Sequence, residues 1–258
     1  MDPLTNTFKR RLAGPDVLYG LFVGLADPVA AEIAAGAGFD WVMIDAEHGP
    51  NDIRTLLVQL QATAAYPVAT IVRPPNHDPA TIKRILDLGA QTLIVPMVSS
   101  ADEAEALVAA VRYPPRGVRG VGTALARAAR WNRIPDYLER ADEEICLIAQ
   151  IESSGGLENL AAIAAVDGVD ALFVGPSDLA ASLGHLGNPG HPEVQDAVVG
   201  ALTTITAAGR PAGVYASTGE AATTYVGNGA RFVAVGIDAA LLATATRDLA
   251  RTFRTDSG

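Results

Sequence analysis

Two carboxylates follow short apolar runs of the sequence, where they could share a divalent cation. Glu152 closes the run ICLIAQIE, and Asp178 stands three residues beyond the run ALFVG. If both runs are neighbouring parallel strands of a barrel, their carboxyl ends meet at one mouth and the two side chains converge. Mg²⁺ favours oxygen ligands and usually takes one or two carboxylates while keeping waters. The pair predicts a metal site with room for a 2-oxo acid, although either residue could instead cap a helix, as Asp178 would do well.

A histidine and an arginine also stand at or just after the ends of predicted strands. His48 lies just after the run FDWVMID, three residues beyond Asp45, and Arg73 ends the run PVATIVR. An imidazole with an ordinary pKa of about 6.5 suits general acid–base catalysis, and Asp45 is our candidate for its partner. The rigid fork of donors of Arg73 suits an oxyanion that develops during a reaction. Two alternatives stay open: a purely structural His48, and an ion pair between Arg73 and Asp45.

Two neighbours of these residues are candidate substrate contacts. Gln150 lies in the same apolar run as Glu152, and Ser177 directly precedes Asp178. Exposed N–H groups at the start of a helix bind carboxylates, so we expect the backbone of Ser177 to face the substrate.

The lysine content bears on how a carbanion could be stabilised. The chain has two lysines, Lys9 in the N-terminal lead and Lys83 in a helical pattern, and neither follows a predicted strand. Schiff-base catalysis needs a desolvated lysine aimed into the site. The sequence therefore favours a metal ion as the electron sink.

Eight short apolar runs alternate with segments of helical periodicity. The predicted strands span residues 17–25, 39–45, 67–73, 92–98, 145–152, 171–175, 212–217 and 231–236. The predicted helices span residues 28–38, 52–66, 79–89, 101–113, 156–168, 191–209, 219–229 and 238–253. Strict alternation predicts parallel strands with crossover helices, and continuous apolar strands indicate a sheet buried on both faces. Eight such units predict one α/β domain over residues 1–258, a (β/α)8 TIM barrel, with a doubly wound open sheet as the alternative.

The longest irregular stretch, residues 113–144, falls between the fourth and fifth strands. We expect it on the catalytic side of the barrel, where the loops that follow strands carry the site. Seven arginines lie within residues 112–140: Arg112, Arg116, Arg119, Arg127, Arg130, Arg133 and Arg140. This patch could attract a dicarboxylate substrate, but a solvated or subunit-facing ion-pair surface is the favoured interpretation.

Composition narrows the class of protein. Of the 258 residues 49% are hydrophobic, which is enough for a large core, and no run has the length of a membrane span. The start MDPLTNTFKRRLAG lacks the apolar segment of a signal peptide, so we expect a soluble, cytoplasmic protein. A net charge of -10 argues against binding to nucleic acid. The single cysteine, Cys146, excludes an internal disulfide and is expected to be a buried small hydrophobe.

Long matching strings give the chain a resemblance to the HpcH/HpaI aldolase family. They are AGAGFDWVMIDAEHGPN, VRPPNHDP, QTLIVPMV, RYPPRGVRGVGTALARAARWNRIPDYL, QIE, FVGPSDLAASLG, GNPGHPEVQ and FVAVGID, in order over nearly the whole chain. The resemblance implies a class II aldolase on a TIM barrel that cleaves 4-hydroxy-2-oxo acids to pyruvate and an aldehyde. An example is 4-hydroxy-2-oxoheptanedioate, which gives succinate semialdehyde in aromatic catabolism. The resemblance also implies that the metal is Mg²⁺, Mn²⁺ or Co²⁺, that there is no organic cofactor, and that the protein forms hexamers with exchanged C-terminal helices.

The resemblance also implies roles for individual residues. Glu152 and Asp178 would bind the metal, and Gln150, Asp178 and the Ser177 backbone would contact substrate. His48 would accept the proton and Arg73 would steady the enolate. The aspartate that raises the basicity of the histidine maps onto Asp87, which lies late in a helical pattern, so Asp87 and Asp45 are both candidates. Tyr215, which borders the aldehyde side of the pocket, and Val121 complete the expected substrate contacts.

Three positions depart from the family pattern and leave the aldehyde open. Tyr215 replaces an aliphatic residue, Ser177 replaces an alanine, and His185 replaces an aromatic residue. The alternatives are an aldolase for 2-dehydro-3-deoxy sugar acids and a broad-specificity hydroxypyruvate/pyruvate aldolase. A lyase of citramalyl-type thioesters is disfavoured because this sequence shows no phosphate-binding loop. A non-catalytic barrel that binds 2-oxo acids is disfavoured because the set of strand-end residues is complete.

Overall fold

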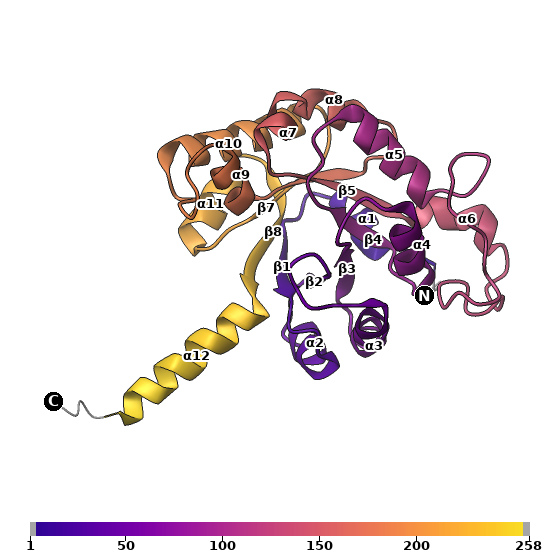
Figure 1. The fold of residues 1–258 in the computed structure, drawn as a ribbon, viewed down its shortest axis with the longest axis horizontal. Helices are drawn as coiled ribbons and strands as arrows, with labels where there is room; N and C mark the ends of the chain where they lie inside the picture. Colours follow the sequence, from indigo (N-terminus) through magenta and orange to yellow (C-terminus); the bar gives the residue numbers. More distant parts are fainter. Residues whose placement is uncertain (1–3, 255–258) are drawn as a thin grey trace.

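The computed structural model describes residues 4–254 and contains a closed, eight-stranded parallel barrel (Figure 1). The strands run in chain order around the barrel, and β1 pairs with β8 to close it. They are β1 (Leu18–Val23), β2 (Trp41–Asp45), β3 (Ala69–Arg73), β4 (Thr92–Val95), β5 (Cys146–Ile151), β6 (Ala171–Val174), β7 (Ala212–Tyr215) and β8 (Ala230–Ile237). The predicted (β/α)8 fold is confirmed, and the open-sheet alternative is wrong.

Crossover helices surround the barrel, and they begin with local sequence signals. They are α2 (Pro28–Ala35), α3 (Ile53–Thr63), α4 (Pro79–Asp87), α5 (Ala101–Val111), α7 (Ser154–Glu158), α8 (Leu160–Ala165), α10 (Pro192–Ala207) and α11 (Gly219–Gly227). Asp27, Asp52 and Asp78 cap three of these helices by accepting hydrogen bonds from backbone N–H groups of the first turn. Predicted helix 156–168 is divided into α7 and α8 near Asn159.

Two short helices that the periodicity did not predict lie at opposite ends of the barrel. Helix α1 (Thr7–Leu12) places Phe8 and Leu12 in the apolar cluster inside the barrel, so it plugs the amino-terminal end. Helix α9 (Pro176–Ser182) follows β6 directly at the carboxyl-terminal end and carries the start of the candidate site. Both were too short to show a period.

The barrel interior is filled by large side chains that need glycines opposite them. The Trp41 indole lies against Gly20, where an added Cβ would fall 2.1 Å from the ring, and it donates a hydrogen bond to the Leu18 carbonyl at 3.1 Å. The Phe232 ring likewise packs against Gly213, where an added Cβ would meet it. Cys146 is fully buried in this cluster, as predicted. Tight packing of this kind fixes the strands, and therefore the side chains at their ends.

The long stretch between the fourth and fifth strands is at the other end of the barrel from the one predicted. It follows α5, so it starts at the amino-terminal end of the strands and leads through α6 (Tyr137–Glu144) into β5. The Ala128 N–H donates to the Asp87 carbonyl, and Arg127 donates to the Leu88 carbonyl, which tie the stretch to the end of α4. The prediction of a catalytic-side loop was wrong, because the stretch follows the helix predicted over residues 101–113, and this crossover helix has already returned the chain to the amino-terminal end of the strands.

The last helix, α12 (Asp238–Phe253), projects away from the barrel (Figure 1). None of its residues is buried. Within residues 4–254, none of the helices combines the length and apolar character that crossing a membrane requires.

Candidate active site

A cavity of about 350 Å³ opens at the carboxyl ends of the strands. We call it the strand-end cavity. Eight of the predicted site residues line it: Asp45, His48, Arg73, Gln150, Glu152, Ser177, Asp178 and Tyr215. They come from the ends of β2, β3, β5 and β7 and from the start of α9. The barrel thus brings together side chains that are far apart in the sequence.

Glu152 is a buried carboxylate, 2% exposed, just beyond β5. Its Oε1 accepts a hydrogen bond from the Met97 N–H at 2.8 Å, and its Oε2 accepts one from the Gln150 amide. Burial, together with the nearby carboxylates of Glu47 and Asp178, raises its pKa to about 7 against the lowering effect of these hydrogen bonds. Without a compensating cation, an ionised Glu152 is therefore unfavourable at this position.

Several features of this corner fit a divalent cation. The Oε1 atom of Gln150 is buried and accepts no hydrogen bond, so one oxygen lone pair is left unused beside Glu152. Gly175 leaves the approach to the carboxylate open, because an added Cβ would lie 2.5 Å from Glu152 Oε2. Asp178 is exposed to the cavity from the first turn of α9. Carboxylate and amide oxygens with too little positive charge beside them form the kind of site that binds Mg²⁺ or a similar ion.

Arg73 is held by two carboxylates. Its Nε and Nη2 donate to the two oxygens of Asp45 at 2.8 and 2.7 Å, and its Nη1 lies 3.1 Å from Oε2 of Glu47. The Asp45–Arg73 ion pair, left open by the sequence, is present. Burial alone would raise the pKa of Asp45, but the hydrogen bonds and charge of Arg73 outweigh it and lower that pKa. The guanidinium is fixed at the cavity wall, also 5.4 Å above the ring of Phe22.

His48 lies at the rim of the cavity, with a side chain 66% exposed. Its Nε2 is 3.8 Å from Oε2 of Glu47. Among the described hydrogen bonds, those of the Asp45 carboxylate go to Arg73 and to the backbone after β2, not to the His48 ring. The role of Asp45 as partner of His48 stays a prediction, and its described role is to position Arg73.

Tyr215 separates the strand-end cavity from a second cavity of about 330 Å³. Its ring packs against Phe22 at 5.6 Å between centroids. The second cavity also contacts Ser177, Thr218 and Glu220, so its lining is polar where it leaves the barrel. The position of Tyr215 agrees with its expected place at the far end of the pocket.

Two predicted site residues do not reach the cavity of their own chain. Asp87 ends α4 at the amino-terminal end of the barrel, where its carboxylate accepts a hydrogen bond from Arg119 at 3.0 Å. Val121 is 63% exposed in the long stretch at that same end. Because both lie at the wrong end of the strands, neither contacts the strand-end cavity within one chain.

Neither lysine lines the strand-end cavity. Lys9 belongs to α1, donates to the Ile145 carbonyl and pairs with Asp170 at 3.0 Å, at the amino-terminal end. Lys83 lies on α4. The inference that no Schiff-base lysine faces the site agrees with the structure.

Sequence reasoning missed three contributors to the site. Glu47 was passed over although it follows a strand end directly, and it contacts Arg73 and has a raised pKa because of burial. Met97 supplies a backbone N–H to Glu152 from a left-handed conformation with φ of 56°, which no sequence pattern announces. Gly175 could have been found, because a glycine between a strand and a carboxylate-bearing helix suggests a close approach.

The closed barrel, with its acidic and basic side chains gathered at the carboxyl ends of the strands, defines the class of (β/α)8 barrels that carry their active site at that face. The model of the HpcH/HpaI aldolase/citrate lyase family matches residues 18–245, and the chain belongs to this family.

Individual relatives agree with that assignment. A hydroxypyruvate/pyruvate aldolase of Deinococcus radiodurans is 60% identical over 257 residues, which cover 100% of this chain and 93% of the relative. A 4-hydroxy-2-oxo-heptane-1,7-dioate aldolase of Salmonella dublin is 52% identical, with coverage of 97% and 95%. A crystal structure of an HpcH/HpaI aldolase/citrate lyase family protein from Burkholderia cenocepacia superposes with a TM-score of 0.93 at 43% identity, with coverage of 97% and 100%.

Proposed function

We propose that the protein is a divalent-metal-dependent aldolase that reversibly cleaves 4-hydroxy-2-oxo acids to a 2-oxo acid and an aldehyde. The 2-oxo acid is pyruvate, or hydroxypyruvate in a broader specificity. The observation that carries the proposal is the meeting of Glu152, Asp178, Arg73 and His48 on one cavity that no lysine lines. The printed activities of the Deinococcus and Salmonella relatives support the same reaction class.

Glu152 and Asp178 are the residues that would hold Mg²⁺, Mn²⁺ or Co²⁺. The bound cation would supply Lewis-acid polarisation of the 2-oxo group and a template for the substrate. The Met97 N–H and the Gln150 amide fix the orientation of the Glu152 carboxylate. The backbone of Ser177 and the side chain of Gln150 line the same cavity, and we propose that they receive the carboxylate of the substrate.

The side chains of this chain account for the proton and charge movements. His48, directly or through a water molecule, takes the proton of the C4 hydroxyl, and the C3–C4 bond breaks as the aldehyde forms. The electron pair of that bond moves into an enolate, whose oxygen is stabilised by the positive charge of Arg73. Protonation of C3 then gives the 2-oxo acid. Asp45 and Glu47 keep the guanidinium in position throughout.

The aldehyde is selected beyond C4, where Tyr215 stands between the two cavities. We propose that polar aldehydes such as succinate semialdehyde extend past its ring. An aldehyde panel with pyruvate as nucleophile measures this choice, and Tyr215→Leu should change the ranking by roughly 10-fold, the size expected of one altered pocket contact.

We propose that the protein acts as a homo-oligomer, a hexamer by resemblance. Helix α12 carries four apolar side chains that are each more than half exposed: Leu241, Leu242, Leu249 and Phe253. An exposed apolar face of this kind indicates an interface with another protein chain. Because Asp87 and Val121 lie at the wrong end of their own barrel, they can act at a site only in another copy. Light scattering should give several chains per particle, and Leu242→Asp with Leu249→Asp should lower the mass. A monomeric wild-type protein would contradict this part of the proposal.

The reaction class is tested by chelation and metal restoration. After exhaustive treatment with EDTA, cleavage of 4-hydroxy-2-oxo acids should be lost, and Mg²⁺, Mn²⁺ or Co²⁺ should restore it. Full activity in the chelated protein would overturn the metal-dependent mechanism. A restored protein that cleaves none of the 4-hydroxy-2-oxo acids in the panel would overturn the aldolase assignment.

A further inference from the structure

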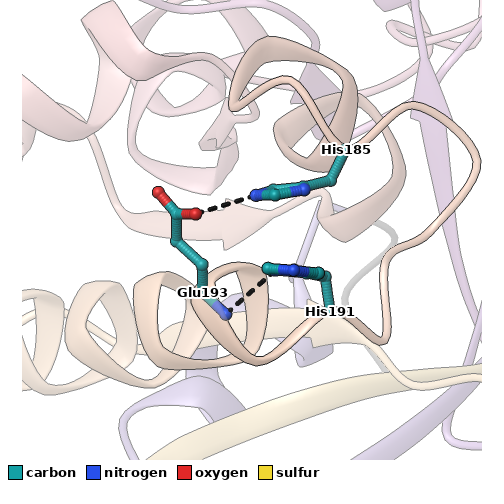
Figure 2. A group of neighbouring side chains, drawn as sticks. All are labelled: His185, His191 and Glu193. Atoms are coloured by element: carbon teal, nitrogen blue, oxygen red, sulfur yellow. Dashed lines mark hydrogen bonds and ion pairs between the residues drawn. The ribbon is translucent and has the colours of Figure 1, made fainter.

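A group of two histidines and a glutamate lies on the loop between α9 and α10, outside the strand-end cavity (Figure 2). One nitrogen of His185, one nitrogen of His191 and one carboxylate oxygen of Glu193 all lie within 4.8 Å of one another. The two imidazole rings stack with centroids 3.6 Å apart and an interplanar angle of 15°. His185 Nε2 lies 2.8 Å from Glu193 Oε2. Among the residues that the structure describes, this is the group that brings three potential metal-ligating side chains so close.

The backbone of the loop holds these side chains in place. The His185 N–H donates to the Ala180 carbonyl at 2.7 Å, which fastens the loop to the end of α9. The Asn188 N–H donates to the His185 carbonyl at 2.9 Å, and the His191 N–H donates to the Asn188 carbonyl at 3.1 Å. His191 is the N-cap of α10, and Glu193 is in its first turn. The donor groups are therefore pre-positioned on ordered backbone, which lowers the entropic cost of gathering them around an ion.

We propose that His185, His191 and Glu193 bind one divalent transition-metal ion of the Zn²⁺ type, with water in the remaining position. Two imidazoles and one carboxylate are a ligand set that suits Zn²⁺, Co²⁺, Ni²⁺ and Cu²⁺, whereas Mg²⁺ prefers oxygen ligands alone. Metal–nitrogen and metal–oxygen distances of about 2.0 to 2.2 Å place ligand atoms roughly 3.3 Å apart in a tetrahedral site. Ligand atoms that lie within 4.8 Å of one another need to approach by up to about 1.5 Å to reach it, and because an imidazole lone pair lies in the plane of its ring, the stacked rings also need to tilt away from their 15° interplanar angle.

The hydrogen bonds that the ion would displace are few. His191 Nδ1 accepts a hydrogen bond from the Glu193 N–H at 3.3 Å, which is long and therefore weak. Whether the ion takes Nδ1 or Nε2 of this ring, only that bond must be given up, because a neutral imidazole has one lone pair. The contact between His185 and Glu193 would be replaced by a bond of each to the same cation, so their attraction is not lost.

The proposed site differs from the strand-end site in its donors and in its position. The strand-end site offers the carboxylates of Glu152 and Asp178, whereas the loop site offers two nitrogens and one oxygen. The two sites are linked through α9, whose first turn carries Asp178 and whose end leads into His185. A cation on the loop would fasten the end of α9 to the start of α10.

The test is a Zn²⁺ titration of the full-length chain carrying Glu152→Gln and Asp178→Asn, so that the carboxylate site does not contribute. We expect about one Zn²⁺ per chain by equilibrium dialysis, and a rise in Tm with Zn²⁺ but not with Mg²⁺. Added His185→Phe, which keeps a stacked ring but removes the ligand nitrogen, should weaken Zn²⁺ binding at least tenfold and abolish the Tm rise. His191→Asn keeps an N-cap acceptor for α10 and should do the same.

Two matched variants complete the experiment. His77→Gln removes a histidine whose Nε2 bonds the Pro96 carbonyl, and Glu105→Gln removes an exposed carboxylate on α5, so both should leave Zn²⁺ binding unchanged. The proposal is overturned if the background chain binds no Zn²⁺. It is also overturned if His185→Phe and His191→Asn, folded as judged by circular dichroism, bind Zn²⁺ as tightly as the background chain.

Discussion

Two buried arginines, each paired with an aspartate, lie at opposite ends of the barrel, and their surroundings differ. At the carboxyl ends of the strands, all three arms of Arg73 face the carboxylates of Asp45 and Glu47. At the amino-terminal end, Arg119 is 1% exposed, donates to Asp87 through Nη2, and has no hydrogen-bond partner at Nε or Nη1. Its guanidinium lies 4.5 Å above the Tyr113 ring.

The difference is one of charge balance. Around Arg73, one cation faces Asp45, Glu47 and Glu152, with Asp178 nearby, so the strand-end cavity has an excess of negative charge. Around Arg119, donors exceed acceptors. A buried group that lacks its complement is costly, so the first end has a use for a metal cation. At the second end, the contact between Arg119 and Asp87 joins α4 to the long stretch.

The largest effect is expected from the carboxylate that would hold the cation. Glu152→Gln keeps the shape of the side chain and removes its charge, so kcat/KM should fall by roughly 10⁴-fold as several kcal/mol of charge stabilisation are lost. Steady-state kinetics measures this, and Tm in the absence of metal should not fall, because a buried charge has been removed. Activity within tenfold of wild type would remove Glu152 from the metal site.

The second-largest effect on activity is expected from substitution of His48. His48→Ala should lower kcat by about 10² to 10⁴-fold because general acid–base catalysis is lost, with little change in Tm since the ring is exposed. His77→Ala provides the comparison, as that histidine lies on the loop after β3. An unchanged kcat in His48→Ala would exclude it as the base.

The two ion pairs can be compared directly by substituting each aspartate. Asp45→Asn leaves a buried guanidinium with less compensation and should cost about 3 to 5 kcal/mol of unfolding free energy. Asp87→Asn should cost about 1 to 3 kcal/mol, because that carboxylate is 27% exposed and makes one charged hydrogen bond. Urea unfolding of both variants at one pH gives the two numbers. Equal losses would mean that the two ends do not differ as described.

A further effect is a pH dependence of the metal-free protein. The pKa of Glu152 rises from 4.5 to about 7 on folding, so the folded state binds its proton more tightly than the unfolded state. The stabilisation is complete below pH about 4.5 and is lost as pH rises towards about 7. Tm of the chelated protein should therefore decrease across this window by more than Tm of Glu152→Gln does. Parallel curves for the two proteins would contradict the raised pKa.

The barrel and most of the site could be predicted because both depend on a repeated pattern. Alternating apolar runs and helices require parallel strands, and parallel strands require that Asp45, Arg73 and Glu152 share one face. The sequence left the partner of Asp45 open between His48 and Arg73. The structure shows the ion pair with Arg73, because the strand register sets Asp45 opposite Arg73. The end at which the long stretch lies could have been predicted from the helix expected over residues 101–113, because a segment that follows a crossover helix starts at the amino-terminal end of the strands.

The central claim is that Glu152 and Asp178 hold a divalent cation that makes C3 of a bound 2-oxo acid acidic. Exchange of the C3 protons of pyruvate into D2O, followed by NMR, tests it without any aldehyde. We predict exchange with Mg²⁺, Mn²⁺ or Co²⁺ and none after chelation or in Glu152→Gln. Undiminished exchange in the chelated protein, or pyruvate binding with metal but without exchange, would contradict the account.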